Sequence, residues 1–118
     1  MTIEYGRIIL RPLQEIDLVK FSQYRSDREV ARFQSWSAPY SLAQGRELLT
    51  RMLGNPMGTP GEWFSFAIIL EEQGVLIGDC AFQILANDGL QAQFGITLSR
   101  EFQGKGYAFE AITALFSF

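Results

Sequence analysis

The sequence predicts an α/β (α+β) domain, in which a mixed, mostly antiparallel sheet is flanked by helices. Three strand candidates follow one another after residue 62 and are joined by short, glycine-bearing turns, which is typical of an antiparallel meander. Helical patterns lie before and after this meander, and amphipathic helices need a partner layer to bury one face. The chain has 118 residues, of which 47% are hydrophobic, so we expect one domain over residues 1–118.

The N-terminal segment predicts one strand followed by one helix. Residues 8–10 are apolar and partly β-branched, and we expect their strand to end at Pro12, which has no backbone N–H to donate. Residues 13 to 24 are predicted to form a helix with Leu18 and Phe21 on one face. A less regular stretch follows.

A second helix is predicted between Ser41 and Gly54. Ser41-Leu-Ala-Gln44 is a capping-box pattern at its start, and Gly54 supplies its stop. The proline- and glycine-rich segment 55–61 then predicts a loop. The apolar stripe of the helix is expected to consist of Leu48, Leu49, Met52 and Leu53.

The three strand candidates make up the predicted meander. They run from Trp63 to Leu70, from Val75 to Ile84 and from Gln91 to Leu98. The connections 71–74 and 86–89 each carry a glycine and are short enough for hairpins.

The segment Gln103-Gly-Lys-Gly-Tyr-Ala108 separates the last strand from a final helix that is predicted to run from Gly106 to Phe118. Such a loop turns N–H groups toward a helix N-terminus, and glycines let a ligand approach the main chain, so the segment predicts a phosphate site. A P-loop is excluded because Gly106, and not Ser or Thr, follows Lys105, and Phe109 stands where a dinucleotide fingerprint needs Gly or Ala. The final helix is expected to bury the stripe Ala108, Ile112, Leu115 and Phe116.

Composition excludes several classes of function. The net charge is −3 and no cluster of Lys and Arg occurs, so we expect no nucleic-acid partner. No apolar run is long enough for a membrane span, and the single cysteine favours a reducing, cytoplasmic location. With no histidine, the chain offers no Ser-His or Cys-His catalytic pair and little for a metal site.

The remaining pattern, Gln-x-x-Gly-x-Ala after a strand, resembles the pyrophosphate-binding motif of the GNAT superfamily of N-acetyltransferases. The longer string 102–111, Phe-Gln-Gly-Lys-Gly-Tyr-Ala-Phe-Glu-Ala, resembles the branch of ribosomal-protein alanine acetyltransferases. Residues 7–13, 26–33 and 76–78 are similar to the first strand, the segment after the first helix and the end of the second hairpin of that branch. The similarity covers nearly the whole chain, and the C-terminal third of the family's domain has no counterpart in it.

The resemblance implies acetyl-CoA as cosubstrate and a primary amine as acceptor: a protein N-terminus, a polyamine or a small amine. In the family, the pantetheine arm lies along the strand before the loop, and the pyrophosphate rests on the N–H groups of the loop. The residues that this places around the cofactor are Ile96, Thr97, Leu98, Gln103, Gly104, Lys105, Gly106, Tyr107 and Ala108.

Catalytic residues are not assigned by the resemblance. Many members have a carboxylate on the strand before the loop, but the matching position here is Gln93, an amide that cannot act as a base. The tyrosine that protonates the leaving thiolate in many relatives lies on a later helix that this chain lacks. Two classes of function therefore stay open: an N-acetyltransferase, which we favour, and a catalytically degenerate module that binds CoA or serves as an interaction partner.

Without the following strand of the family, strand 91–98 is expected to be an exposed sheet edge with unpaired backbone groups. We therefore expect the chain to form a homodimer through this edge or to aggregate, or else to be part of a longer protein.

Plainer interpretations stand beside these hypotheses. The segment 103–108 also fits an ordinary strand-to-helix turn, and Lys105 fits a solvated charge at its rim. Cys80 is expected to be a buried packing residue. Trp36 and Tyr40 either line an acceptor pocket or pack in the core. Tyr107 is expected to pack, and Glu110 to complement the helix dipole.

Overall fold

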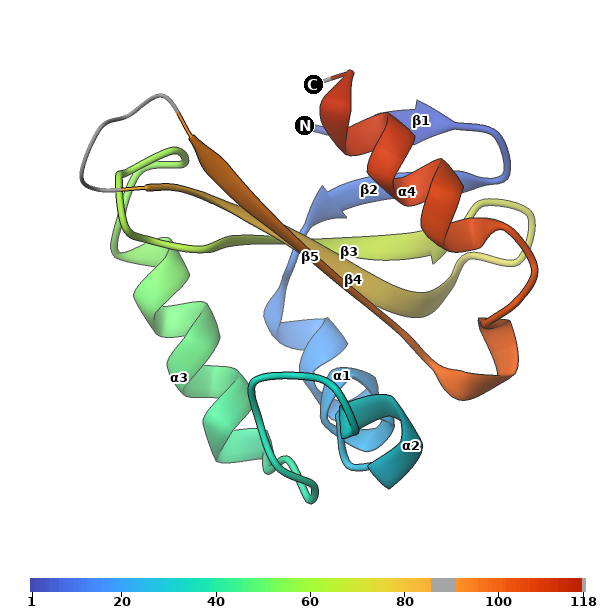
Figure 1. Cartoon of the computed structure of the whole chain (residues 1–118), viewed down its shortest axis with the longest axis horizontal. Coiled ribbons are helices and arrows are strands. Elements are labelled where there is room, and N and C mark those ends of the chain that lie inside the picture. Colours follow the sequence, from blue (N-terminus) through green and yellow to red (C-terminus); the bar gives the residue numbers. More distant parts are fainter. Residues whose placement is uncertain (86–90, 118) are drawn as a thin grey trace.

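The computed structural model describes residues 1–85 and 91–117. Its five described strands form one sheet in the order β1-β2-β3-β4-β5, with every neighbouring pair antiparallel (Figure 1). β1 and β5 are consequently the two edges of the sheet. The strands are β1 (Ile3–Tyr5), β2 (Ile8–Pro12), β3 (Phe64–Leu70), β4 (Val75–Ile84) and β5 (Ala92–Leu98).

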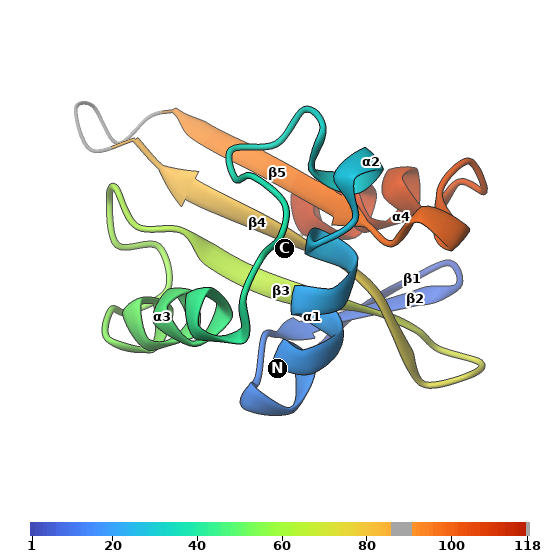
Figure 2. The ribbon, with the colours of Figure 1, turned by 90° about the horizontal axis from the view of Figure 1, so that it is seen from below.

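Helices cover both faces of this sheet. α1, α2 and α3 lie on one face and α4 lies on the other, as Figures 1 and 2 show from two directions. The helices are α1 (Leu18–Arg25), α2 (Arg28–Ala31), α3 (Leu42–Leu53) and α4 (Tyr107–Phe116), with 3₁₀ turns at Glu15–Asp17 and Arg100–Phe102.

The predicted meander and most predicted boundaries are confirmed. The turn 71–74 joins β3 to β4, whereas the predicted turn 86–89 lies outside the described residues. Two short elements, β1 and α2, were not predicted, because segments of three and four residues show no clear periodicity.

The predicted helix 13–24 begins later than expected. A 3₁₀ turn precedes α1, and the Asp17 carboxylate holds that turn in place. Asp17 Oδ2 accepts from the Gln14 backbone N–H at 2.8 Å, and its two oxygens accept from the Arg11 guanidinium at 2.7 and 2.8 Å. This side-chain clamp competes with regular helix geometry at the start of the segment.

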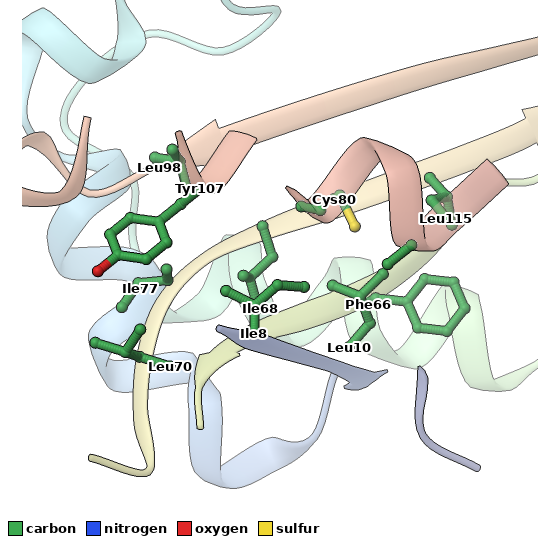
Figure 3. Close-up of a cluster of buried hydrophobic side chains, with 12 residues drawn as sticks. Ile8, Leu10, Phe66, Ile68, Leu70, Ile77, Cys80, Leu98, Tyr107 and Leu115 are labelled. Atoms are coloured by element: carbon green, nitrogen blue, oxygen red, sulfur yellow. The ribbon is translucent and has the colours of Figure 1, made fainter. Parts of the chain in front are cut away.

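Each face of the sheet buries its own core. The core beneath α4 combines residues of β2, β3, β4, β5 and α4 (Figure 3). The core beneath the other helices is built around Phe21, Leu49 and Met52, from α1 and α3. The first cluster consists of Ile8, Leu10, Phe66, Ile68, Leu70, Ile77, Cys80, Leu98, Tyr107, Ala111, Ala114 and Leu115.

In the predicted stripe of α4, Leu115 is buried as expected, Ala108 and Ile112 are half-buried, and Phe116 was placed wrongly. The helix buries Tyr107, Ala111, Ala114 and Leu115, whereas Phe116 is 65% exposed. Ala111 and Ala114 are fully buried in the core that α4 shares with the sheet, and their small size lets the helix backbone lie close to the strands. A pattern that counts bulky apolar residues misses such a small-residue face.

The last residue of the predicted α3 stripe, Leu53, was also placed wrongly. Leu49 and Met52 are buried as expected, but Leu53, at the end of the helix, is 70% exposed. The capping box at the other end of α3 is confirmed: Ser41 Oγ accepts from the Gln44 backbone N–H at 3.1 Å, and Gln44 Oε1 accepts from the Ser41 N–H at 2.8 Å.

Gly78 is required by the close approach of β4 and β5. A Cβ atom at this position would lie 2.2 Å from the Thr97 carbonyl oxygen and 3.0 Å from the Leu98 Cα. A register shift between Ile68 and Ile69 of β3 lies opposite the same stretch of β4. Any side chain at position 78 must therefore push the two strands apart.

We expect Gly78→Ala to lower the free energy of unfolding by about 2 kcal/mol, because the added methyl group overlaps backbone atoms that cannot rotate away. Urea denaturation measures the change. Gly95→Ala in β5 is the matched control, since a Cβ there meets nothing within 4 Å. Equal stability of both variants would contradict the tight β4–β5 approach.

Candidate functional site

The loop between β5 and α4 presents a row of free backbone donors. Gly104 and Gly106 have φ angles of +75° and +88°, a region that favours glycine, and α4 starts at Tyr107. Among the described residues, the N–H groups of residues 104–109 have no hydrogen-bond acceptor, and the first bond of α4 joins Glu110 N–H to the Gly106 carbonyl at 3.2 Å. Free N–H groups at a helix N-terminus attract an anion.

Arg7, from the turn between β1 and β2, holds this loop in position. Its Nη2 donates to the Lys105 carbonyl oxygen at 2.7 Å, and its guanidinium lies 4.1 Å from the centre of the Tyr107 ring. Its Nε and backbone N–H donate to the two Glu110 oxygens at 2.8 and 2.6 Å. Tyr107 packs, as predicted, and the Lys105 side chain is exposed.

Glu110 has a larger role than the helix-dipole partner expected from the sequence. Its hydrogen bonds from Arg7 lower the pKa of the carboxyl below its ordinary value of 4.5. The pair joins positions 103 residues apart, which is why sequence analysis missed Arg7.

The register of β5 decides which of its backbone groups face the open edge. Ser99 N–H donates to the Ile77 carbonyl at 2.9 Å and Leu85 N–H to the Gln91 carbonyl at 2.9 Å, so odd-numbered residues of β5 bond to β4. The backbone groups of Ile96 and Leu98 therefore point away from β4. The backbone groups of Thr97 pair with β4, and only its side chain is left for a ligand at that position.

Two glutamine side chains cover the open edge. Gln34 Nε2 donates to the Ile96 carbonyl at 3.3 Å, and Gln103 Nε2 donates to the Leu98 carbonyl at 3.0 Å. A cavity of about 190 Å³ lies at this edge. It is lined by Val30, Gln34, Ile96, Thr97, Leu98, Gln103 and Ala108. The structure thus brings the end of β5 and the start of α4 together around one hollow.

A larger cavity, of about 580 Å³, lies on the face of the sheet that carries α1, α2 and α3. Gln34, Ile96 and Thr97 line both cavities, so the two meet at the edge of β5. Trp36 lines the larger cavity, whereas Tyr40 packs in the core with its ring edge against Phe21. Its other lining residues are Arg25, Phe33, Ser35, Leu48, Arg51, Met52, Gly61, Glu62, Trp63, Ser65, Asp79, Ala81 and Gly95.

A buried charged cluster forms part of the wall of the larger cavity. Asp79 Oδ1 accepts from Arg25 Nη2 at 2.8 Å, and Asp79 Oδ2 accepts from the Tyr24 hydroxyl. Burial, followed by the Asp79 charge, raises the pKa of Tyr24 well above its ordinary value. The Arg25 guanidinium lies 4.0 Å from the Trp36 ring centre and 4.1 Å from that of Phe21.

This cluster was missed at the sequence level, although one signal was available. Asp79 interrupts the apolar run of β4 between a glycine and a cysteine, and a carboxylate buried in a strand needs a partner. Nothing in the sequence identifies Arg25 as that partner, because 54 residues separate the two.

A second ion pair lies at the rim of the larger cavity. Arg51 Nε and Nη2 donate to the two Glu62 oxygens at 2.8 and 2.7 Å, which is a bidentate arrangement. These hydrogen bonds hold the pKa of the Glu62 carboxyl below its ordinary value.

Two residues singled out in the sequence lie away from both cavities. Gln93 is exposed and accepts a hydrogen bond from Gln83 Nε2 at 2.7 Å. Cys80 is fully buried, and burial raises the pKa of its thiol to about 12, which confirms it as a packing residue. Among the described residues, no group of metal-ligating side chains comes together, and no helix has the length and hydrophobicity needed to cross a membrane.

Comparisons with known proteins agree on one family. The family model described as "Acetyltransferase (GNAT) domain" matches residues 7–118. A curated relative from Bacillus licheniformis, described as an uncharacterized N-acetyltransferase p20, is 29% identical over 117 residues, which are 99% of this chain and 65% of the relative. The chain thus spans about two thirds of the length of that relative.

Solved structures show the same fold. A GNAT-family acetyltransferase from Bacillus anthracis matches with a TM-score of 0.81 at 21% identity, over 99% of this chain and 64% of that chain. A ribosomal-protein α-N-acetyltransferase solved in complex with coenzyme A matches with a TM-score of 0.77 at 20% identity, over 99% and 66%.

We expect Asp79→Asn to lower the free energy of unfolding by about 3 kcal/mol, because it leaves the Arg25 charge buried without a counter-charge. Tyr24→Phe should cost only about 1 kcal/mol, since it removes one hydrogen bond and no charge. Chemical denaturation compares the two variants. A smaller loss for Asp79→Asn than for Tyr24→Phe would contradict the ion pair as the main stabilising contact.

Glu110→Gln should destabilise the protein at neutral pH but not in acid. The folded pKa of Glu110 is lowered, so its ionised form contributes stability above pH 4.5, and that contribution disappears as the pH falls through the folded pKa. Thermal unfolding between pH 7 and pH 3 would show parent and variant converging. Glu101→Gln, which removes the same charge at an exposed position without touching Arg7, should show no such convergence.

Proposed function

The chain belongs to the acetyltransferase (GNAT) family, and from this premise we propose that it binds acetyl-CoA and serves the transfer of the acetyl group to a primary amine. One observation supports this most directly. The free N–H groups of residues 104–109 and the open backbone edge of Ile96 and Leu98 lie close to one another, because Ile96, Leu98 and Ala108 line the same cavity.

The pyrophosphate would rest on the N–H groups of the loop. Gly104 leaves space for it, since a Cβ there would meet nothing within 4 Å, and the Lys105 ammonium adds a positive charge at the rim. Gln103 starts the loop, Tyr107 anchors it through Arg7, and Ala108 presents only a methyl group to the smaller cavity.

The pantetheine arm would pair with the outward backbone groups of Ile96 and Leu98. Gln34 and Gln103 bond to the carbonyls of these residues in the structure, so each amide would have to yield its acceptor to the ligand. Thr97 lines both cavities, so the thioester would lie near this residue if the cofactor follows the edge of β5.

The acceptor amine would enter through the larger cavity and must lose a proton before it attacks the thioester. Glu62 and Asp79 are the carboxylates among the described residues that line this cavity, and an arginine holds each of them. We assign no catalytic base. The pairing of both carboxylates with arginines favours the second candidate function, a module that binds CoA without catalysis.

Two further expectations belong to this proposal. Pairing of two copies through the open edge of β5 stays a prediction, with the Gln34 and Gln103 amides as the side chains that a second strand would displace. A cytoplasmic location is likewise proposed, on the basis of the single buried cysteine and the family's cosubstrate.

Calorimetric titration with acetyl-CoA tests the cofactor site. We expect Ala108→Trp to weaken binding at least about tenfold, because the indole fills the smaller cavity. Phe116→Trp, on the same helix, is the matched control, since Phe116 is 65% exposed and lines neither cavity, and it should bind like the parent. Equal binding by both variants, or none by the folded parent, would refute the site.

Release of the CoA thiol in the presence of amines separates the two candidate functions. Acetyl-CoA binding together with amine-dependent thiol release supports an acetyltransferase. Binding of acetyl-CoA without release of the CoA thiol in the presence of any amine supports the non-catalytic module.

A further inference from the structure

Three aromatic rings and two closed ion pairs form part of the wall of the larger cavity. Phe33, Trp36 and Trp63 line it, and Phe33 and Trp63 are 88% and 43% exposed. We propose that this cavity selects a monoamine carried on an aromatic or aliphatic body and discriminates against polyamines. This inference rests on the proposed function for calling the amine an acceptor, but the selectivity of the cavity can be measured without acetyl-CoA.

The first argument is charge. Four charged side chains among the described residues line the cavity, and they form two closed pairs, Arg25 with Asp79 and Arg51 with Glu62. The formal charges of the lining cancel. A polyamine that entered would have to desolvate several ammonium groups without a free carboxylate to receive them, which costs free energy that a single ammonium group largely avoids.

The geometry of the pairs makes them poor partners for a second cation. Both oxygens of Asp79 are taken, by Arg25 and by the Tyr24 hydroxyl. Both oxygens of Glu62 accept from Arg51, and Asn55 Nδ2 donates a further bond to Glu62 Oε1 at 3.1 Å. The two carboxylates therefore bind the protein's own arginines and are not free to bind a second ammonium group.

The second argument is the nature of the walls. An aromatic face attracts one ammonium group through its quadrupole and stacks on an aryl or alkyl body. Arg25 lies over the Trp36 ring and the Arg32 guanidinium lies 5.1 Å from the centre of the Phe33 ring, so Trp63 is the more available ring. Leu48 and Met52 of α3 extend the apolar lining. At about 580 Å³, the cavity is of the size that takes a small molecule.

The third argument is position. Ile96 and Thr97 belong to both cavities, so an amine seated among the aromatic rings lies beside the edge that the proposed cofactor follows. Gly95 and Ala81 have no side chain or only a methyl group at this part of the sheet, which leaves room for the body of the ligand. The cavity thus couples apolar recognition to access to the reaction centre.

The chain supplies its own probe for this proposal. It has two tryptophans, Trp36 and Trp63, and both line the cavity. Titration with 2-phenylethylamine and with spermidine, followed by tryptophan fluorescence, compares one ammonium group on an aryl body with a polycation. We expect phenylethylamine to bind at least about tenfold more tightly at equal ionic strength. Equal or tighter binding of spermidine, or no fluorescence response to phenylethylamine, would overturn the proposal.

A charge variant tests the reason for the selectivity. Arg51→Met frees Glu62 and should strengthen spermidine binding about threefold or more, while phenylethylamine binding changes less than about twofold. Arg51 is exposed, so the variant should fold. Arg46→Met is the matched control: Arg46 lies on the same helix and pairs with Glu15 at 3.1 Å, but it does not line the cavity. An unchanged spermidine affinity in Arg51→Met would contradict the closed-pair argument.

The outcomes distinguish this inference from the proposed function. Phenylethylamine selectivity without acetyl-CoA binding would leave the cavity assignment standing and remove the acetyltransferase role. Acetyl-CoA binding with a preference for spermidine would support the proposed function and overturn the selectivity assigned to the cavity.

Discussion

The hydrogen-bond register between β4 and β5 is the constraint on which both cavities depend. In an antiparallel pair, the backbone N–H and C=O groups of every second residue of an edge strand bond to the neighbouring strand, and those of the other residues point to the open side. In this register Thr97 faces Asp79 in β4, while Ile96 and Leu98 present their backbone groups to the open edge. A slip by one residue would exchange the two sets. Gly78 permits this register, because any side chain there would strike the β5 backbone.

Two arginines then fix the loops around this edge. Arg7 joins the β1–β2 turn to the glycine loop and to Glu110, and Arg25 joins α1 to Asp79 in β4 and stacks on Trp36. Each planar guanidinium offers several donors in a fixed geometry, so one side chain can hold a carboxylate and a second group at once. A loop held in this way has less conformational entropy to lose when a ligand binds.

The local predictions succeeded where neighbouring residues decide the conformation. The capping box at Ser41 and the hairpin turn 71–74 both depend on side chains within a few residues. The buried face of α4 was predicted correctly only at Leu115, because the rest of that face depends on how the helix packs on the sheet. The core that α4 shares with the sheet already contains large side chains such as Phe66 and Ile68, and the helix contributes two alanines to it.

The sequence by itself determined the order of the longer strands and helices, the glycine loop with its free N–H groups, and the family to which the chain is similar. These properties follow from short-range sterics and from period-two and 3.6-residue patterns. The tertiary structure decided which backbone groups of β5 are open, which carboxylates are neutralised and which aromatic side chains reach the larger cavity. Each of these depends on a partner tens of residues away, such as Glu110 for Arg7 or Asp79 for Arg25. No local pattern encodes such a partner, because the pairing exists only once the sheet has brought the two segments together.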